Sequence, residues 1–115
     1  MTEIADRPAS SADTADPVEF IKIDVEGAEF EVLQGAWKVL QANKPLVLFE
    51  CGLGGADVYG TTPDDIFDLF ASCDLSISTI EYFNAGKQPF SKIEFNGQFY
   101  KNYNIFFIAY DPAFY

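Results

Sequence analysis

Residues 20–50 read FIKIDVEGAEFEVLQGAWKVLQANKPLVLFE, and this stretch decides the fold. It opens with a short β-branched run at residues 20–25, which stops at an acidic turn around Gly27 and therefore predicts a strand. Residues 46–49, LVLF, form a continuous apolar run of the kind found in strands buried on both faces of a parallel sheet. Between them lies one predicted helical face, made of Phe30, Leu33, Trp37 and Leu40. Strand, helix and strand predict one βαβ unit.

Gly35 interrupts the helical pattern, which predicts either two short helices or one weakened longer helix. Residues 62–65, TPDD, have the order of a helix start: a capping Thr, a Pro in the first turn and two acids that complement the helix dipole. A third strand is predicted within residues 75–83, and a last buried strand at residues 104–110, NIFFIAY. Residues 92–100 contain Asn-Gly and predict a β-hairpin.

The N-terminal segment differs in composition from the rest of the chain. After Met1, residues 2–17 are rich in Ala, Ser, Asp and Pro, and Ile4 is their single large apolar residue. Such a segment cannot bury enough surface to offset the entropy lost on ordering. We therefore expect a disordered tail over residues 1–17 and one folded unit over residues 18–115, since 115 residues allow one small domain.

The composition excludes several classes of function. A net charge of -11 argues against nucleic-acid binding and against an anionic membrane surface, because both are bound through Lys and Arg. The sequence has no apolar leader and no apolar run long enough to span a membrane, so we expect a cytoplasmic protein with Cys51 and Cys73 reduced. With no histidine and no CxxC spacing, no zinc site is predicted and no residue is assigned as a metal ligand. Acid–base chemistry is left to carboxylates, Tyr, Lys, a metal or a partner chain.

Acidic residues follow both of the predicted parallel strands. Asp24, Glu26 and Glu29 flank Gly27, and Glu50 follows the second strand. Because ligands of open α/β sheets bind beyond the carboxyl ends of the strands, Asp24 is a candidate to orient or deprotonate a substrate hydroxyl, or to hold a cation. Glu50 would lie beside it if the strands are neighbours, which makes a carboxylate pair.

Each of these acids also has a purely structural interpretation. Glu26 and Glu29 can serve only to place negative charge at the start of the following helix, and for Glu29 the pattern favours this. Glu50 can serve only to bind backbone groups of the next loop. For Asp24 and Glu50 the sequence leaves the functional and structural interpretations open.

Two further features are assigned to structure rather than to function. Residues 52–57, GLGGAD, resemble a phosphate-binding loop, but GxGxxG needs glycine where Asp57 stands and the next helix begins only near Pro63. We therefore expect an ordinary flexible loop. The many aromatic residues from Tyr82 onward would stack on a sugar or base if exposed, but packing in the core is the commoner use of such rings.

Residues 20–50 resemble the signature segment of the FkbM-type S-adenosylmethionine-dependent methyltransferases. The strand, the DVEGAE turn, the VLxGA helix, the Lys-Pro pair and the strand ending in Glu all match, whereas residues 66–83 and 104–110 match only as a pattern of helix and closing strands. The resemblance implies an α/β, partial Rossmann-like methyltransferase fold, with a mostly parallel sheet and an antiparallel C-terminal strand or hairpin. It also implies methyl transfer from S-adenosylmethionine to an oxygen of a sugar or natural product.

The family binds this cofactor through a Gly-rich loop after its first strand and an acid after its second. Residues before Phe20 show neither, so we expect a fragment without the cofactor-binding half. The resemblance carries over Asp24, Glu26 and Glu50 as candidate catalytic residues, together with Glu29 of the same turn, without individual roles.

The partners expected from this interpretation are a small molecule or sugar with a hydroxyl group, and a second protein surface. That surface belongs either to another copy of the chain, giving a homo-oligomer, or to a complementing N-terminal half. Neither nucleic acid nor a membrane is expected. Two other interpretations stay open: an inactive truncated or split-gene product, and a small non-enzymatic oligomeric binding module.

Overall fold

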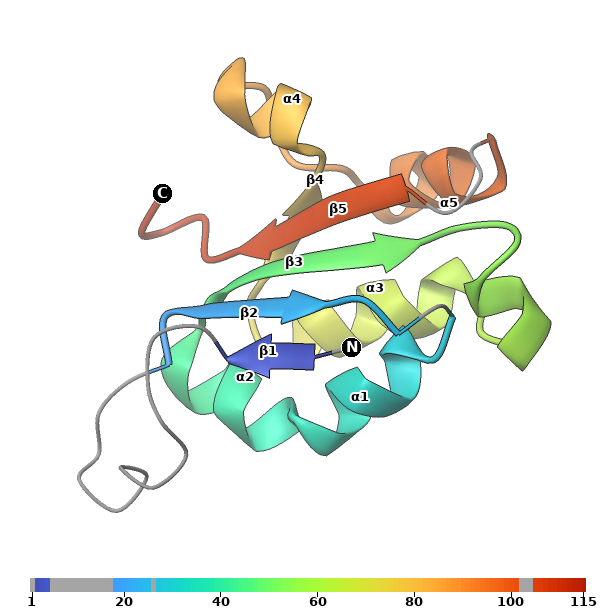
Figure 1. The fold of residues 1–115 in the computed structure, drawn as a ribbon. Coiled ribbons are helices and arrows are strands. Elements are labelled where there is room, and N and C mark those ends of the chain that lie inside the picture. Colours follow the sequence, from blue (N-terminus) through green and yellow to red (C-terminus); the bar gives the residue numbers. More distant parts are fainter. Residues whose placement is uncertain (1, 5–17, 26, 102–104) are drawn as a thin grey trace.

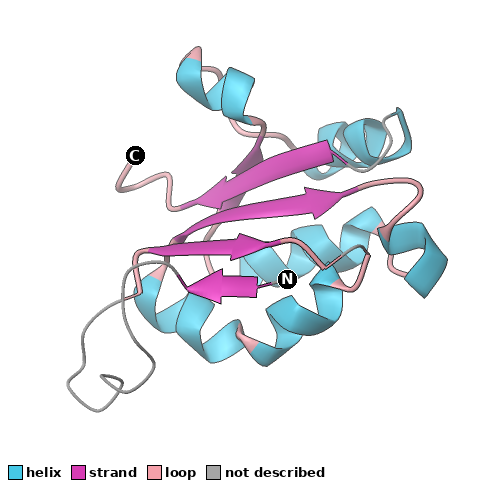
Figure 2. Ribbon diagram, in the orientation of Figure 1, coloured by secondary structure: helices cyan, strands magenta, loops and turns pink. Residues whose placement is uncertain are grey.

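The computed structural model describes residues 2–4, 18–25, 27–101 and 105–115. Within them, a five-stranded sheet has the order β1-β2-β3-β5-β4, with helices packed mainly behind it (Figures 1 and 2). The strands are β1 (Thr2–Ile4), β2 (Phe20–Ile23), β3 (Leu46–Cys51), β4 (Ser76–Ser78) and β5 (Ile105–Tyr110). The helices are α1 (Glu29–Gly35), α2 (Trp37–Asn43), the 3-10 helix η2 (Ala56–Tyr59), α3 (Pro63–Ser72), α4 (Ile80–Asn84) and α5 (Lys92–Lys101).

The sheet is mixed rather than mostly parallel, which corrects the prediction from sequence. Among the described strands β2 and β3 pair in parallel, but β1–β2, β3–β5 and β4–β5 are antiparallel. The strands β2, β3 and β4 therefore run in one direction, and β5 is inserted between β3 and β4 in the opposite direction. The antiparallel C-terminal strand predicted from the sequence is confirmed, as is the α/β class.

The first described strand lies where the composition predicts a loose tail. Residues 2–4 pair antiparallel with β2, so that Glu3 is opposite Lys22. The composition does not predict this strand, because it gives no account of the backbone hydrogen bonds that an open strand edge offers. Residues 5–17 of the predicted tail lie outside the described residues, and the domain boundary at residue 18 stays a prediction.

The predicted βαβ unit is present, and both helix signals in the sequence are accounted for. Gly35 is the last residue of α1, and α2 begins at Trp37, so the interrupted pattern gives two short helices. Thr62 caps α3 in a capping box with Asp65, and Pro63 is in the first turn. Residues 62–65 therefore begin a helix for the reasons that their sequence suggested.

The core lies between the sheet and the helices behind it. Alternate residues of β2 and β3 are buried, as expected when side chains of a strand point to opposite faces. At its centre, Phe49 contacts Phe70 of α3 and Phe107 of β5, with ring centroids 5.0 and 5.8 Å apart. Phe95 of α5 packs edge-on against Phe107 at 5.1 Å. These rings attach α3 and α5 to the same face of the sheet.

The predicted hairpin at residues 92–100 is wrong, because this segment is the helix α5. Ser91 and Glu94 form reciprocal hydrogen bonds: the Ser91 Oγ accepts from the Glu94 N–H at 3.1 Å, and the Glu94 carboxylate accepts from the Ser91 N–H at 2.8 Å. Phe95 and Phe99, four residues apart, are both fully buried. Together, the capping box and the apolar pair outweigh the turn preference of Asn-Gly.

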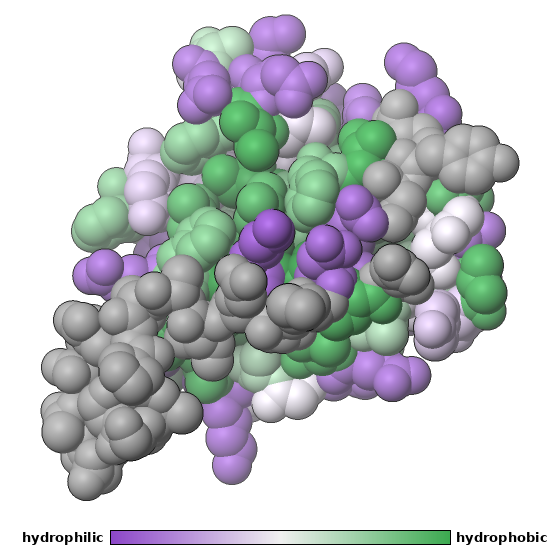
Figure 3. All heavy atoms as spheres, in the orientation of Figure 1, coloured by the Kyte–Doolittle hydropathy of each residue, from purple (hydrophilic) through white to green (hydrophobic). Residues whose placement is uncertain are grey.

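The other face of the sheet is turned toward the viewer in Figure 1. Here Lys22, Leu48, Glu50 and Phe106 are half-buried. Figure 3 shows hydrophobic residues gathered over the middle of this face. In the described part of the chain, no helix is long and apolar enough to cross a membrane.

Candidate functional site

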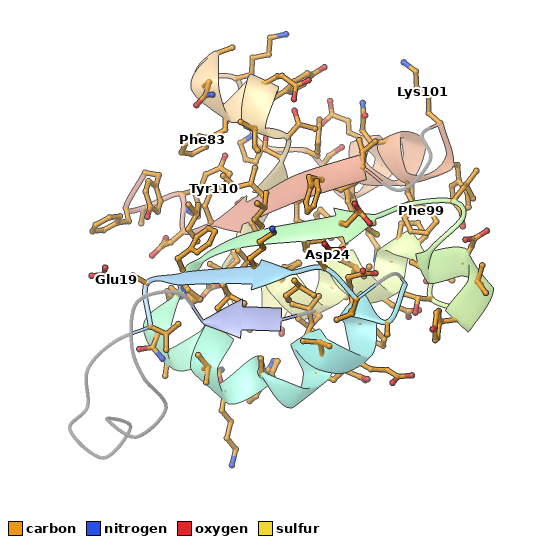
Figure 4. All side chains as sticks on the ribbon, viewed as in Figure 1. Glu19, Asp24, Phe83, Phe99, Lys101 and Tyr110 are labelled. Atoms are coloured by element: carbon orange, nitrogen blue, oxygen red, sulfur yellow. The ribbon has the colours of Figure 1, made fainter. Side chains whose placement is uncertain are left out.

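Asp24 and Glu50 lie at the same edge of the sheet, where the two parallel strands end. The register pairs Ile23 with Phe49, so the next residues along the two strands are Asp24 and Glu50. Neighbouring strands are about 4.8 Å apart, and residues at matching positions share a face. Both residues are half-buried, and Figure 4 shows Asp24 just past the tip of β2. The register therefore puts the two residues that the sequence singled out at matching positions just past Ile23 and Phe49, while Glu26 lies outside the described residues.

The acidic turn after β2 is locked against the loop that follows β3. Gly27 has φ +105°, and a Cβ built on it would lie 2.5 Å from the Gly55 carbonyl oxygen and 2.9 Å from the Tyr59 ring. Only glycine tolerates both this backbone conformation and this approach. The turns that follow the two carboxylate-bearing strands are thus held against each other.

Glu29 plays a larger part in this turn than helix capping. It is the first residue of α1, and its side chain is fully buried. Its Oε2 accepts a hydrogen bond from the Gly27 N–H at 3.1 Å, while its Oε1 finds no hydrogen-bond partner among the described residues. A buried carboxylate oxygen without a donor is unfavourable. The sequence offered one signal for this arrangement, a glycine two residues earlier whose N–H is within reach.

Cys51 faces this carboxylate from the end of β3. Its thiol is buried, and burial, followed by the charge of Glu29, raises the thiol pKa well above its usual range, against a smaller opposing hydrogen bond from the Gly52 backbone. A thiol with a raised pKa is protonated at neutral pH and is a poor nucleophile. Cys73 is also free and buried. Cys51 therefore serves packing beneath the acidic turn rather than covalent catalysis.

The Gly-rich loop after β3 uses its own amide donors. The N–H groups of Gly54 and Gly55 both bind Asp57 Oδ1, at 2.8 and 3.1 Å. Asp57, the residue that breaks the GxGxxG pattern, thus occupies the donors that a phosphate would need. The loop is organised around an internal carboxylate.

Five of the described aromatic residues from Tyr82 onward are buried, as predicted, whereas Tyr100, Phe114 and Tyr115 are exposed. Tyr82 contacts Phe90 at 5.1 Å, and Phe83 contacts Tyr110 at 4.9 Å, a pair labelled in Figure 4. The buried rings are Phe90, Phe95, Phe99, Phe107 and Tyr110. Sequence reasoning did not foresee that Tyr82 and Phe106 also line a hollow of about 380 Å³ beside the start of β5.

These features define a mixed α/β domain with neighbouring carboxylates at the carboxyl edge of two parallel strands. Its described residues contain no group of three or more His, Cys, Asp or Glu side chains placed to hold a metal ion. Residues 10–77, more than half of the chain, match the family model described as the methyltransferase FkbM domain. The chain therefore belongs to the FkbM methyltransferase family, of whose domain it matches a part. No curated protein and no solved structure matches it.

Proposed function

We propose that this chain is the acceptor-binding part of an S-adenosylmethionine-dependent O-methyltransferase with a Rossmann-like fold, acting on a hydroxyl group of a sugar or natural product. The observation that carries this proposal is the parallel register of β2 and β3, which pairs Ile23 with Phe49, the residues just before Asp24 and Glu50. Membership of a methyltransferase family gives the reaction class. The edge of the sheet is also where ligands of α/β domains bind.

The two carboxylates suit the needs of an acceptor hydroxyl. In O-methylation the hydroxyl oxygen would form a bond to the methyl carbon while the bond from that carbon to the sulfonium sulfur breaks, and the hydroxyl proton must leave. A carboxylate within hydrogen-bond reach accepts that proton as a general base. A second carboxylate nearby accepts a hydrogen bond from a neighbouring hydroxyl and fixes the direction of the attacking oxygen. Asp24 and Glu50 would fill these two roles.

The described residues do not fit the cofactor itself. A dinucleotide-like or nucleoside ligand is usually held by free backbone amides of a Gly-rich turn. In the Gly-rich loop after β3, Asp57 takes the Gly54 and Gly55 amides, and the Gly55 carbonyl packs on Gly27. We therefore assign S-adenosylmethionine to residues outside the described part, supplied by a complementing N-terminal half.

Mixing experiments test whether this chain binds the acceptor while an N-terminal half binds the cofactor. Calorimetric titration of the chain alone with S-adenosylmethionine is expected to show weak or no binding. The chain is then mixed with the N-terminal half of an FkbM domain that binds the cofactor by itself, and release of S-adenosylhomocysteine is followed with a panel of hydroxylated acceptors. No release above that of the N-terminal half alone would refute the proposal, as would micromolar cofactor binding by the isolated chain.

The carboxylates are tested in the active mixture. Asp24→Asn and Glu50→Gln are expected to lower turnover by about 100- to 10,000-fold, the usual contribution of general acid–base groups, with little change in melting temperature. Glu31→Gln, an exposed acid of α1, is the matched control and should leave turnover unchanged. Near-normal turnover in both Asp24→Asn and Glu50→Gln would give these residues a structural role only.

A further inference from the structure

A hollow of about 380 Å³ lies beyond the end of β4, at the same edge of the sheet as Asp24 and Glu50. Because β4 runs in the direction of β2 and β3, the carboxyl ends of all three strands share this edge, and β5 begins there. The lining includes Thr79, Ile80, Glu81, Tyr82, Gln98 and Phe106. The hollow therefore draws on the residues just after β4, on α5 and on the first residues of β5.

A single residue, Phe106, connects the hollow with the carboxylate pair. Phe106 lines it and is the register partner of Glu50, so the two side chains lie on the same face of neighbouring strands. Asp24 is one strand further along. At about 4.8 Å per strand, a ring resting on Phe106 would reach Glu50 with one of its substituents and would have Asp24 within one further strand spacing.

The chemistry of the lining indicates the kind of ring that fits. Ile80, Tyr82 and Phe106 offer apolar surface for the face of a ring. Thr79, Glu81 and Gln98 carry polar groups of the kind that bind hydroxyls. Among the described residues that line the hollow there is no Lys or Arg; Lys87 lies over the Tyr82 ring at 4.4 Å and lines a separate hollow.

We propose that this hollow holds the ring of the methyl acceptor, and that it selects uncharged acceptors over anionic ones. The identification of the ligand as the methyl acceptor rests on the proposed function, whereas the binding of a ring in this hollow does not. Glu81 in the lining and Glu50 beside it are both acids, and the chain as a whole carries a charge of -11. A phosphate or carboxylate on the ligand would be repelled and would find no cationic partner among the described residues of the lining.

Binding is tested without cofactor or turnover, using two probes that differ in one group. 4-Nitrophenyl β-D-glucoside and 4-nitrophenyl β-D-glucuronide are titrated into the ¹⁵N-labelled chain, and amide shifts are followed by NMR. We expect the glucoside to shift the amides of Ile80, Glu81 and Phe106. The glucuronide should bind at least about fivefold more weakly, because one like-charge contact in water changes the affinity by about this factor. No shift with either probe, shifts centred elsewhere, or equal affinities would overturn the proposal.

Matched variants separate local binding from general effects. Ile80 and Ile93 are both exposed, at 43% and 85%, but only Ile80 lines the hollow. Ile80→Ala should weaken glucoside binding severalfold, whereas Ile93→Ala should not. Glu81→Gln should reduce the preference for the neutral probe, whereas Glu31→Gln should leave it intact. Glucoside binding without methyl transfer in the mixing experiment would refute the proposed function but support the hollow as a binding site. Methyl transfer without glucoside binding would support the proposed function but refute the hollow as the binding site.

Discussion

Gly27 is the residue on which the geometry of the candidate site depends most. Its positive φ and its contact with the Gly55 carbonyl join the turns after β2 and β3, and its N–H holds the buried carboxylate of Glu29. This arrangement requires that residue 27 have no side chain, because a Cβ there would clash with the Gly55 carbonyl. The glycine therefore holds the turn after β2 close to the loop after β3 without any reactive group of its own.

Replacing this glycine is predicted to be costly for the whole fold. Gly27→Ala should lower the free energy of unfolding by about 2 kcal/mol or more, because it combines a strained backbone with a close backbone contact. Gly35→Ala is the control: a Cβ there meets nothing within 4 Å, and removing a helical glycine should stabilise by about 0.5–1 kcal/mol. Urea unfolding of the two variants measures both effects. Equal stability of the two would mean that the lock between the turns contributes little.

At the scale of elements, the sequence predicted the parts whose signals are local. The strand at residues 20–25, the two short helices around Gly35, the capped start of α3 and the closing strand all follow from periodicity and capping. The order of pairing does not, because insertion of β5 between β3 and β4 depends on contacts distant in sequence. Asp24 and Glu50 could be proposed because strand ends are visible in a sequence, whereas the hollow beside Phe106 needs α4, α5 and β5 to be placed first.

The hairpin predicted where α5 lies was wrong because two local signals in this segment disagree. Asn-Gly predicts a turn, yet SKIE at residues 91–94 is a capping-box sequence, and the four-residue separation of Phe95 and Phe99 is typical of a helix. The capping box satisfies two backbone donors, and the two rings bury fully. Since Gly97 meets nothing within 4 Å, its cost is only that of a glycine in a helix, about 1 kcal/mol.

The same capping box gives a prediction for the element as a whole. Ser91→Ala removes the side-chain acceptor for the Glu94 N–H, and should lower the stability of the domain by about 1 kcal/mol, the usual cost of a lost N-cap. Ser91→Asp keeps an acceptor at that position and should be nearly neutral. Thermal unfolding followed by circular dichroism compares the two. If both variants lose the same stability, the capping bond is not what begins α5.

At the scale of the whole molecule, β1 changes the expectation about association. From sequence alone, the outer edge of β2 should be open and ready to pair with another chain. In the structure, Thr2–Ile4 covers the edge of β2 opposite Ile21–Ile23. We therefore expect β1 to compete with both proposed partners, a second copy of the chain and an N-terminal half.

Deleting β1 should therefore promote association. Removal of residues 2–4 exposes backbone N–H and C=O groups along β2, and unpaired edges of this kind pair with other chains. Removal of residues 10–12, which lie outside the described part, is a control of equal length. Gel filtration with light scattering should show a dimer or larger species at lower concentration for the first deletion than for the second. The difference should grow with salt, because self-repulsion at a net charge of -11 is screened over about 8 Å at physiological ionic strength. Identical masses for the two deletions at every salt concentration would show that β1 does not protect this edge, and that repulsion or the opposite face of the sheet controls association instead.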